Sequence, residues 1–370
     1  MAVLQKEIPA FEFRDAQINK IRYCKQDFAH ISHYVVTDYD WKDYCPVAFR
    51  RLRELENIDH TEYMLAICAE DVIREVSAPG KFGRLIILTT DERFVIKTLR
   101  KSEVKVMVDM LPNYYAYLKK NRASLLTKLY GIHVVKPHGG LKVYFSVLST
   151  VIPSSVGKCK IYDLKGTPKG RKQNRKKIEG KVIYKDKDFD LLLHLDPLTH
   201  YKFLKQLRDD CEFLESEKIM DYSLLIGVAM QAPNKVATDG SCSCGQKAVP
   251  NSSSTAKFGS LNKSGEMCQM SNSPDFNFGM AMRARATTRR GGSAHPSIQD
   301  PRGCNVKLYF KIVDIFQNYG VSKRIEHVYK SLQYDSKSIA AVSPEVYSTR
   351  FQDYLHQIFQ SEDSEKGDAF

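Results

Sequence analysis

A long low-complexity segment inside the chain constrains the fold more than any other feature. Between Gln231 and Cys304, regular patterning gives way to Ser, Asn, Gly, Thr and Ala with scattered charge, as in NSSSTAKFGSLNKSGE. Such a composition cannot bury enough apolar surface to order itself. Residues 39–230 alternate strand-like and helix-like runs, and the strand-like pattern resumes with VKLYFKIVDIF from Val306. We therefore expect an insert that splits one α+β domain, provided that the last strand pairs with the earlier ones.

Composition limits the size of the hydrophobic core, and cysteine usage indicates the redox state of the cellular compartment. With 370 residues, 43% of them hydrophobic, the chain can form one two-lobed catalytic domain or two ordinary domains. No apolar run approaches the ~18 residues of a membrane-spanning helix, and residues 1–13 lack the layout of a secretory signal. Nine cysteines, an odd number, favour reduced thiols. Four of them have a spacing that is not a common structural zinc pattern: Cys242, Cys244, Cys268 and Cys304.

The charge balance indicates a polyanionic partner without identifying it. Lys and Arg number 56 against 43 Asp and Glu, which leaves a formal net charge of +13. Such an excess attracts a protein to nucleic acid or acidic lipid, although a solvated basic surface without a partner has the same composition. The chain carries no zinc-finger, RNA-recognition or aromatic-interleaved signature, so we expect no nucleic-acid partner.

Two neighbouring strand-like runs, Arg84–Leu88 and Arg93–Lys97, predict a hairpin. A glycine-containing turn, Ser77–Gly83, precedes them. A helix-prone segment, Ser102–Leu118, follows, with an expected interruption near Pro112. This order is the layout of a kinase N-lobe, in which the turn covers ATP phosphates and the strand lysine reaches them. Ordinary tight turns and solvent-seeking lysines produce the same pattern by chance, so other residues must decide.

Three carboxylates from distant parts of the chain lie beside or within apolar strand-like sequence. They are Asp163 in YDLKGT, Asp221 in IMDYSLL and Asp314 in KIVDIF. Burying a charge is costly without a partner, and a magnesium-bound nucleotide is such a partner, because hard divalent ions bridge carboxylates to phosphates. The alternative is that each Asp is a turn or cap residue beside a strand.

Four motifs together resemble the phosphatidylinositol phosphate kinase family: YDLKGT at 162–167, IMDYSLL at 219–225, FVIKTL at 94–99 and KIVDIF at 311–316, the last followed by SKRIEHVYKSLQYD. The resemblance covers almost all of residues 41–230 and 305–360, and is greatest to plant-like type I forms without an N-terminal repeat array. It implies an α+β, two-lobed kinase-like fold with antiparallel sheets. The implied boundaries are an N-terminal extension at 1–38, an N-lobe at 39–152, a C-lobe at 153–230 and 304–361, a disordered insert at 231–303 and a C-terminal tail at 362–370.

The resemblance also implies roles for matching residues. The ATP-binding set is Gly80, Lys81 and Gly83 of the phosphate loop, Lys97 of the strand, and Leu148 and Val151 of the adenine hinge. Lys165 would neutralise the phosphoryl group in flight and, with Asp163, matches the family's DLKG motif. Asp221 would activate or position the inositol hydroxyl and contact the metal, and Asp314 would hold the metal. These roles fit phosphoryl transfer, in which positioning and charge neutralisation supply most of the catalysis.

A protein kinase is excluded by the absence of its own motifs. The sequence has no His-Arg-Asp loop, no Asp-Phe-Gly directly after the last strand and no Ala-Pro-Glu. The nearest match, Asp275–Gly279 (DFNFG), lies in the low-complexity segment.

The substrate assignment depends on the basic segment after Asp314. This segment contains Lys323, Arg324, Glu326 and Lys330 and can lie at an anionic bilayer, although a solvated basic helix has the same pattern. Within the family, Glu326 resembles the type I enzymes, which act on the 5-position of phosphatidylinositol 4-phosphate. Arg171 matches a basic position near the substrate. The resemblance thus implies ATP, Mg²⁺, phosphatidylinositol 4-phosphate and an anionic membrane surface as cofactors and partners.

Two departures from the family pattern leave a second interpretation open. The phosphate loop usually reads Gly-Lys-Ser-Gly-Ser, whereas this chain has Phe82 and Arg84 at the two serine positions, and DLKG is followed by Thr167 and Pro168. The alternative function is a catalytically impaired, phosphoinositide-binding scaffold. Retention of Lys97, Lys165, Asp221 and Asp314 favours the enzyme. We expect a cytoplasmic protein that binds peripherally to the inner face of the plasma membrane. A nuclear fraction of the protein and a homodimer are left open.

Overall fold

The computed structural model describes residues 18–24, 38–68, 73–77, 85–153, 156, 159–167, 177–178, 181–231, 281–289, 303–319 and 343–362. All of them belong to one compact unit, Met1–Gln231 with Asn277–Phe370. The second unit, Ala232–Phe276, contains none of the described residues. Within the described part of the chain, no helix is both long and apolar enough to cross a membrane.

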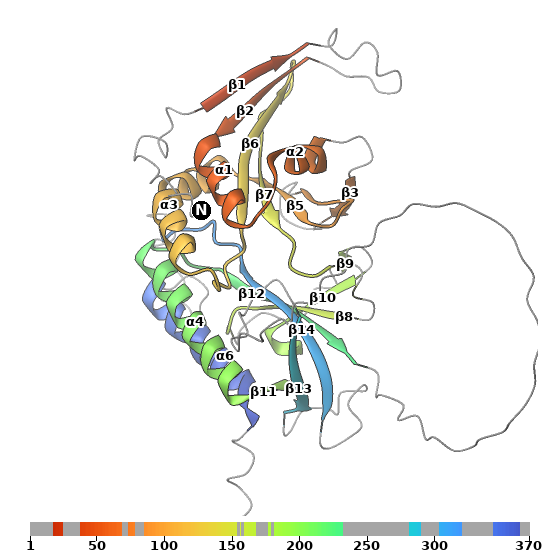
Figure 1. The fold of residues 1–370 in the computed structure, drawn as a ribbon, viewed down its shortest axis with the longest axis vertical. Coiled ribbons are helices and arrows are strands. Elements are labelled where there is room, and N and C mark those ends of the chain that lie inside the picture. The colour runs from red at the N-terminus through yellow and green to blue at the C-terminus, as the bar shows by residue number, and fades with distance from the viewer. Residues whose placement is uncertain are drawn as a thin grey trace, which may run out of the picture. The chain divides into compact units, whose positions relative to one another are not determined.

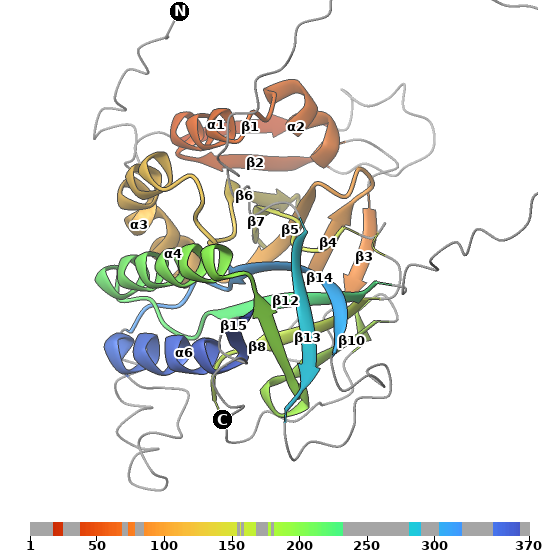
Figure 2. The same cartoon turned by 60° about the horizontal axis from the view of Figure 1, so that its bottom comes forward.

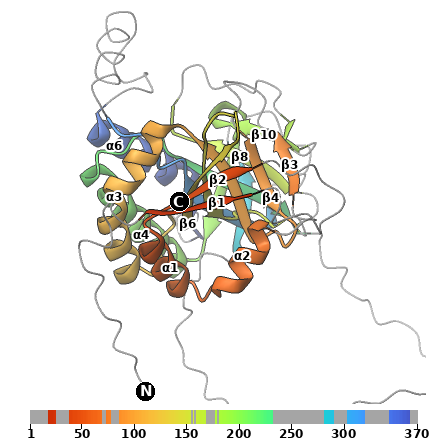
Figure 3. The ribbon, with the colours of Figure 1, turned by 90° about the horizontal axis from the view of Figure 1, so that it is seen from above.

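The first sheet has seven strands in the order β1-β2-β6-β7-β5-β4-β3, and every neighbouring pair is antiparallel. Its strands are β1 (Ile18–Tyr23), β2 (Tyr39–Tyr44), β3 (Ile73–Ser77), β4 (Leu85–Thr89), β5 (Phe94–Leu99), β6 (Leu129–Pro137) and β7 (Val143–Ser149). The expected hairpin is confirmed as β4 and β5. The strand β1 pairs with β2 along its whole length, as seen in Figure 3, so the expected extension at 1–38 contributes an edge strand to this sheet.

Three helices accompany the first sheet: α1 (Pro46–Leu55), α2 (His60–Cys68) and α3 (Lys101–Lys120). The helix α3 continues through Pro112, so the expected interruption there is wrong. A proline removes one intrahelical hydrogen bond. The buried side chains on both sides of it, among them Met110, Leu111 and Tyr114 at 0–2% exposure, hold the helix in place by packing.

The second sheet has eight strands in the order β15-β11-β13-β14-β12-β8-β10-β9. Its strands are β8 (Cys159–Leu164), β9 (Lys177–Ile178), β10 (Lys181–Lys185), β11 (Leu191–Leu195), β12 (Ser223–Met230), β13 (Met282–Thr288), β14 (Cys304–Val313) and β15 (Phe359–Ser361). Two pairs, β8 with β10 and β11 with β15, are parallel, and the others are antiparallel. The late strand β14 pairs with β12 along its length. The condition for an insert that splits one domain is therefore met.

The strand β13 corrects the expected boundary of the insert. Met282–Thr288 lie within residues 231–303, which we expected to be disordered, yet they pair with β11 on one side and β14 on the other (Figure 2). Burial alternates along the strand, with Met282, Ala284 and Ala286 at 8%, 9% and 0% exposure. The period of two was present in MRARATT, but its inward residues are mostly alanine, which gives little hydrophobic signal.

Two long helices, α4 (Pro197–Ser216) and α6 (Pro344–Ile358), lie side by side in Figures 1 and 2. Both begin with a polar cap followed by proline: the Asp196 carboxylate accepts from the Thr199 amide at 3.0 Å, and Ser343 caps α6. The inner face of α4 packs on the second sheet through Phe203, whose ring centroid lies 5.4 Å from that of Phe310. The sequence pattern near Tyr347–Phe359, which follows the basic stretch after Asp314, also predicts a helix, and the structure confirms it as α6.

Candidate active site at the strand ends of the second sheet

The topology of the second sheet brings the three sequence-predicted carboxylates to one edge. The strand β12 is antiparallel to both β8 and β14, with Leu225 opposite Asp163 and Ser223 opposite Val313. The start of β12 therefore lies beside the ends of its two neighbours. Asp163 is the second-last residue of β8, Asp221 lies just before β12, and Asp314 directly follows β14.

Lys165 and Asp221 form the first of three lysine–aspartate pairs at this edge. Lys165 Nζ donates to Asp221 Oδ1 at 2.6 Å and also to the Asp221 main-chain oxygen. The two side chains are 15% and 26% exposed. An ammonium group that bonds both the carboxylate and the carbonyl of one residue fixes the direction of that carboxylate.

Lys97 and Asp314 form the second pair, which joins the two sheets. Lys97 Nζ, from β5, donates to Asp314 Oδ1; the Lys97 side chain is 10% exposed and that of Asp314 is 48% exposed. Desolvation raises the pKa of Asp314, but the Lys97 charge and hydrogen bond, together with the Lys165 charge, hold that pKa below its ordinary value. Asp163 opposes this effect. The charges of Lys97, Lys165 and Asp163 therefore all act on the Asp314 carboxylate.

Lys185 and Asp163 form the third pair. The two residues are register partners in the parallel pair β10 and β8, and Lys185 Nζ donates to Asp163 Oδ2. The following residue, Asp186, accepts from the backbone amides of Lys165 and Gly166 at 2.7 Å each. Asp186 begins a short 3-10 turn, η3 (Asp186–Asp188). The turn after β10 therefore holds the loop that carries Lys165.

Gly166 allows this loop to approach α6. Its φ is +67°, in the left-handed region that favours glycine. A Cβ atom at this position would lie 2.9 Å from Tyr354 Cβ and 3.0 Å from the Arg350 carbonyl oxygen. The glycine of the DLKG motif is therefore needed for both backbone conformation and helix packing.

Asp221 and Asp314 adopt the same unusual backbone conformation. Each has φ of 65°, and both lie where a strand begins or ends. Aspartate tolerates this region better than most residues, yet the conformation costs about 1–3 kcal/mol and persists only where the surroundings enforce it. Tyr222, next to Asp221, is 0% exposed and packs edge-on against Tyr347 and Phe351 of α6, at ring-centroid distances of 4.8 and 5.1 Å. Buried aromatic packing thus holds the Asp221 turn.

Comparison with known proteins assigns the family. Residues 67–358 match the family model described as phosphatidylinositol-4-phosphate 5-kinase. The chain belongs to this family. The Arabidopsis thaliana protein phosphatidylinositol 4-phosphate 5-kinase 10 is 37% identical over 96% of this chain and 97% of its own length. Phosphatidylinositol 4-phosphate 5-kinase 1 of the same plant is 42% identical over 88% of this chain and 46% of its own length. Another Arabidopsis protein, with a provisional name of the same type, is 39% identical over 96% of this chain and 98% of its own length.

The phosphatidylinositol-4-phosphate 5-kinase family fold confirms the expected α+β class with largely antiparallel sheets. Of the sequence-predicted site residues, the structure brings Asp163, Lys165, Asp221 and Asp314 to one edge and joins Lys97 to Asp314. Leu148 and Val151 lie at the end of β7 and just beyond it. Eight predicted residues lie outside the described residues: Gly80, Lys81, Gly83, Arg171, Lys323, Arg324, Glu326 and Lys330.

Two residues of this kinase-family site were missed from the sequence, Lys185 and Asp186. Their only local signal is that the apolar run of β10 ends in the charged string KDKD. Among the described residues, no group of three or more His, Cys, Asp or Glu could hold a metal by itself. The donor set of two carboxylates, Asp221 and Asp314, nevertheless fits Mg²⁺, which is commonly bound by one or two carboxylates together with substrate phosphates.

Proposed function

We propose that the chain is a lipid kinase that transfers the γ-phosphate of ATP to the 5-hydroxyl of phosphatidylinositol 4-phosphate, giving phosphatidylinositol 4,5-bisphosphate at a membrane surface. The observation that carries this proposal is the set of three lysine–aspartate pairs at one edge of the second sheet. Phosphoryl transfer depends mainly on positioning and on neutralising the moving charge. Ammonium and carboxylate groups fixed at strand ends suit both tasks.

Each residue has a role in this proposal. Lys97 contacts the ATP phosphates, and Lys165 neutralises the phosphoryl group as it moves. Asp221 orients the inositol hydroxyl with a carboxylate that Lys165 holds at 2.6 Å. Asp221 and Asp314 would hold Mg²⁺, which when bound would neutralise phosphate charge and bridge the phosphates to the protein. Asp163 fixes Lys185 beside the Lys165 loop.

The choice of lipid is supported by the named activity of the relatives. Both named Arabidopsis relatives are phosphatidylinositol 4-phosphate 5-kinases, and one of them aligns over nearly its whole length. In the proposal, Arg171, Lys323, Arg324 and Lys330 contact the headgroup or the membrane, and Glu326 sets the 5-kinase specificity. Gly80, Lys81 and Gly83 cover the phosphates, and Leu148 and Val151 flank the adenine.

A basic hollow on the first sheet supports action at an anionic surface. It has a volume of about 430 Å³ and is lined by residues on or next to β1, β2, β6 and β7. Its bases are Lys20, Arg22, Lys42, Lys136 and Lys142. Bases near an anionic bilayer contribute about 1 kcal/mol each to binding. We therefore propose a peripheral protein at the cytoplasmic face of the plasma membrane.

The test is phosphate transfer from Mg-ATP to vesicles that each carry one monophosphorylated phosphoinositide, with products identified by mass spectrometry. The proposal expects the 4,5-bisphosphate from the 4-phosphate, and little product from the 3- and 5-phosphates. Product chiefly from the 5-phosphate would contradict the assigned acceptor hydroxyl. Vesicle binding by folded protein without any product would favour the phosphoinositide-binding scaffold.

A further inference from the structure

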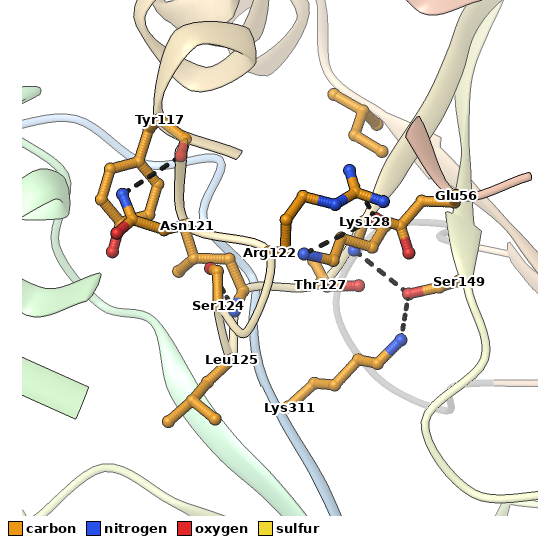
Figure 4. Close-up of polar contacts among 12 residues, drawn as sticks. Glu56, Tyr117, Asn121, Arg122, Ser124, Leu125, Thr127, Lys128, Ser149 and Lys311 are labelled. Atoms are coloured by element: carbon orange, nitrogen blue, oxygen red, sulfur yellow. Dashed lines mark hydrogen bonds and ion pairs between the residues drawn. The ribbon is translucent and has the colours of Figure 1, made fainter. Parts of the chain in front are cut away.

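The side chain of Lys311 connects the second sheet to the end of β7 in the first. Lys311 is a partly buried residue of β14, three positions before Asp314. Its Nζ donates to Ser149 Oγ at 2.7 Å, as Figure 4 shows. Ser149 is the last residue of β7 and is 6% exposed. This contact lies within the segment proposed as the adenine hinge, Leu148–Val151.

Ser149 is held from several directions. Its side-chain oxygen also accepts from the Lys128 amide at 3.1 Å, and its own amide donates to the Lys128 carbonyl at 2.9 Å. The amide of the next residue, Thr150, donates to the Arg93 carbonyl at 3.1 Å. The side chain and the backbone of Ser149 thus belong to one hydrogen-bond network. A change in the hydrogen bonds of the Ser149 hydroxyl would therefore also shift the hinge backbone.

Besides its pairing with β12, the end of β14 makes three contacts with residues outside the second sheet. Lys311 contacts Ser149, Ile312 exchanges backbone hydrogen bonds of 2.8 Å with Leu125 and Thr127, and Asp314 pairs with Lys97. The proposed function assigns Lys97 to ATP phosphates and Asp314 to the metal, so the third attachment uses groups that a bound nucleotide would recruit. The first two attachments remain available to keep β14 in register with the hinge.

The surroundings of Lys311 are rich in positive charge. Lys128 is 6% exposed, and its Nζ lies 3.9 Å from Glu56 Oε1, which is also 3.7 Å from Arg122. The Tyr130 hydroxyl also interacts with the Ser149 side chain. Burial, reinforced by the Lys128 charge and partly offset by Glu56, lowers the pKa of Lys311 to about 8.

We propose that Lys311 is a positioning residue for the nucleotide: its hydrogen bond to Ser149 sets the distance between the hinge and Asp314, and so the fit of ATP between them. The proposal rests on the proposed ATP site but not on the identity of the lipid acceptor. A charged donor makes a stronger hydrogen bond than a neutral one, so the protonated amine is the effective form.

The test is the Kd of a non-hydrolysable ATP analogue with Mg²⁺, measured by calorimetry without lipid. Lys311→Met should weaken binding about tenfold, the worth of a charge-assisted hydrogen bond, and Lys311→Arg should recover part of the loss. Ser149→Ala should weaken binding at least as much, because it removes the same bond and the acceptor of the Lys128 amide. The double variant should be no weaker than Ser149→Ala alone, because that substitution already removes the Lys311–Ser149 hydrogen bond together with the acceptor of the Lys128 amide. Lys307→Met, on the same face of β14 but exposed, is the matched control and should bind as the wild type does.

A pH series separates positioning from a loss of stability. The affinity of the wild type for the ATP analogue should be highest well below pH 8. It should fall as the pH rises through about 8, where Lys311 loses its proton. The Met variant should lack this inflection, and the Arg variant should also lack it, because guanidinium does not titrate there. A general loss of folding would instead lower the Tm of the Met variant. An inflection that persisted in the folded Met variant would belong to another group and would overturn the role assigned to Lys311.

Equal affinity and equal pH profiles in the wild type and Lys311→Met would overturn the inference and leave the lipid kinase proposal intact. Additive losses in the double variant would also overturn it. Wild-type nucleotide binding without phosphate transfer to any lipid would contradict the proposed function but not the role of Lys311. No nucleotide binding by the folded wild type would contradict both.

Discussion

Asp221 and Asp314 show how single residues are fixed at the site. Both occupy a left-handed backbone conformation at a strand end, and each carboxylate is held by a lysine from elsewhere in the chain. Such conformations persist where packing and hydrogen bonds enforce them. The sequence predicted these aspartates and lysines as site residues because their motifs are specific. It could not predict which lysine pairs with which aspartate, because pairing depends on the register between distant strands.

Gly166 gives the sharpest test at the scale of one residue. Gly166→Ala should lower the free energy of unfolding by about 2–4 kcal/mol, because left-handed strain adds to a clash with the α6 backbone. Gly139→Ala is the matched control, since Gly139 also has positive φ (+71°) but nothing lies within 4 Å of the added Cβ. Its cost should be the strain alone, about 1 kcal/mol. Equal losses for the two variants in urea unfolding would show that the contact with α6 is unimportant.

At the scale of elements, strong local patterns were predictable and weak ones were not. The hairpin β4–β5, the late strand β14 and the helix α6 have clear periodicity, and the structure confirms them. The strand β13 was missed because alanines form its buried face, and α3 passes through Pro112 because tertiary packing outweighs the local cost of proline. The pairing of β1 with β2 also depended on long-range contacts.

Asp210 connects α4 to α3 and to the segment that follows it. It is 0% exposed and accepts from the Tyr117 hydroxyl at 2.6 Å and from Ser124 Oγ and the Leu125 amide, each at 2.7 Å. Burial raises its pKa to about 6, although these hydrogen bonds and Lys128 oppose the shift. Between pH 3.8 and about 6 the native protein therefore retains a proton that the unfolded chain has released.

This linkage predicts the pH dependence of stability. The contribution of Asp210 is complete below pH 3.8, decreases as the pH rises to about 6 and is constant above it, with a total change of roughly 3 kcal/mol. The difference in unfolding free energy between the wild type and Asp210→Asn should therefore fall across this interval. Asp209→Asn, the neighbour on α4, should keep the wild-type pH dependence. A pH-independent difference for Asp210→Asn would refute the raised pKa.

At the scale of the whole molecule, the motifs predicted the family and supplied the residues proposed for the chemistry, whereas the residues that support them required the structure. Lys185 meets Asp163 only because β10 runs parallel to β8, and Lys311 meets Ser149 only because two sheets approach each other. Neither contact has a local signature. The expected lipid-contacting residues Lys323, Arg324, Glu326 and Lys330 lie outside the described residues, so their roles stay predictions.

The basic hollow of the first sheet predicts a charge-dependent membrane affinity. Replacing both Lys136 and Lys142 by Glu should weaken binding to anionic vesicles by at least about tenfold, because each base contributes about 1 kcal/mol at such a surface. Lys105→Glu with Lys205→Glu is the matched control, since it makes the same charge change at exposed positions of α3 and α4. Co-sedimentation at several salt concentrations measures the effect. Equal losses in both double variants would mean that only net charge matters.

The central claim is that the carboxylates at the strand ends of the second sheet are required for phosphate transfer from ATP to the lipid. The most direct measurement is the rate of transfer from Mg-ATP to phosphatidylinositol 4-phosphate vesicles by the wild type, Asp314→Asn and Asp109→Asn. Asparagine tolerates the left-handed conformation of Asp314, so this variant should stay folded and yet lose at least about 100-fold in rate, as expected for removing an electrostatic catalytic group. Asp109→Asn, on the exposed face of α3, should retain the wild-type rate. A folded Asp314→Asn protein that transfers phosphate as fast as the wild type would contradict the account.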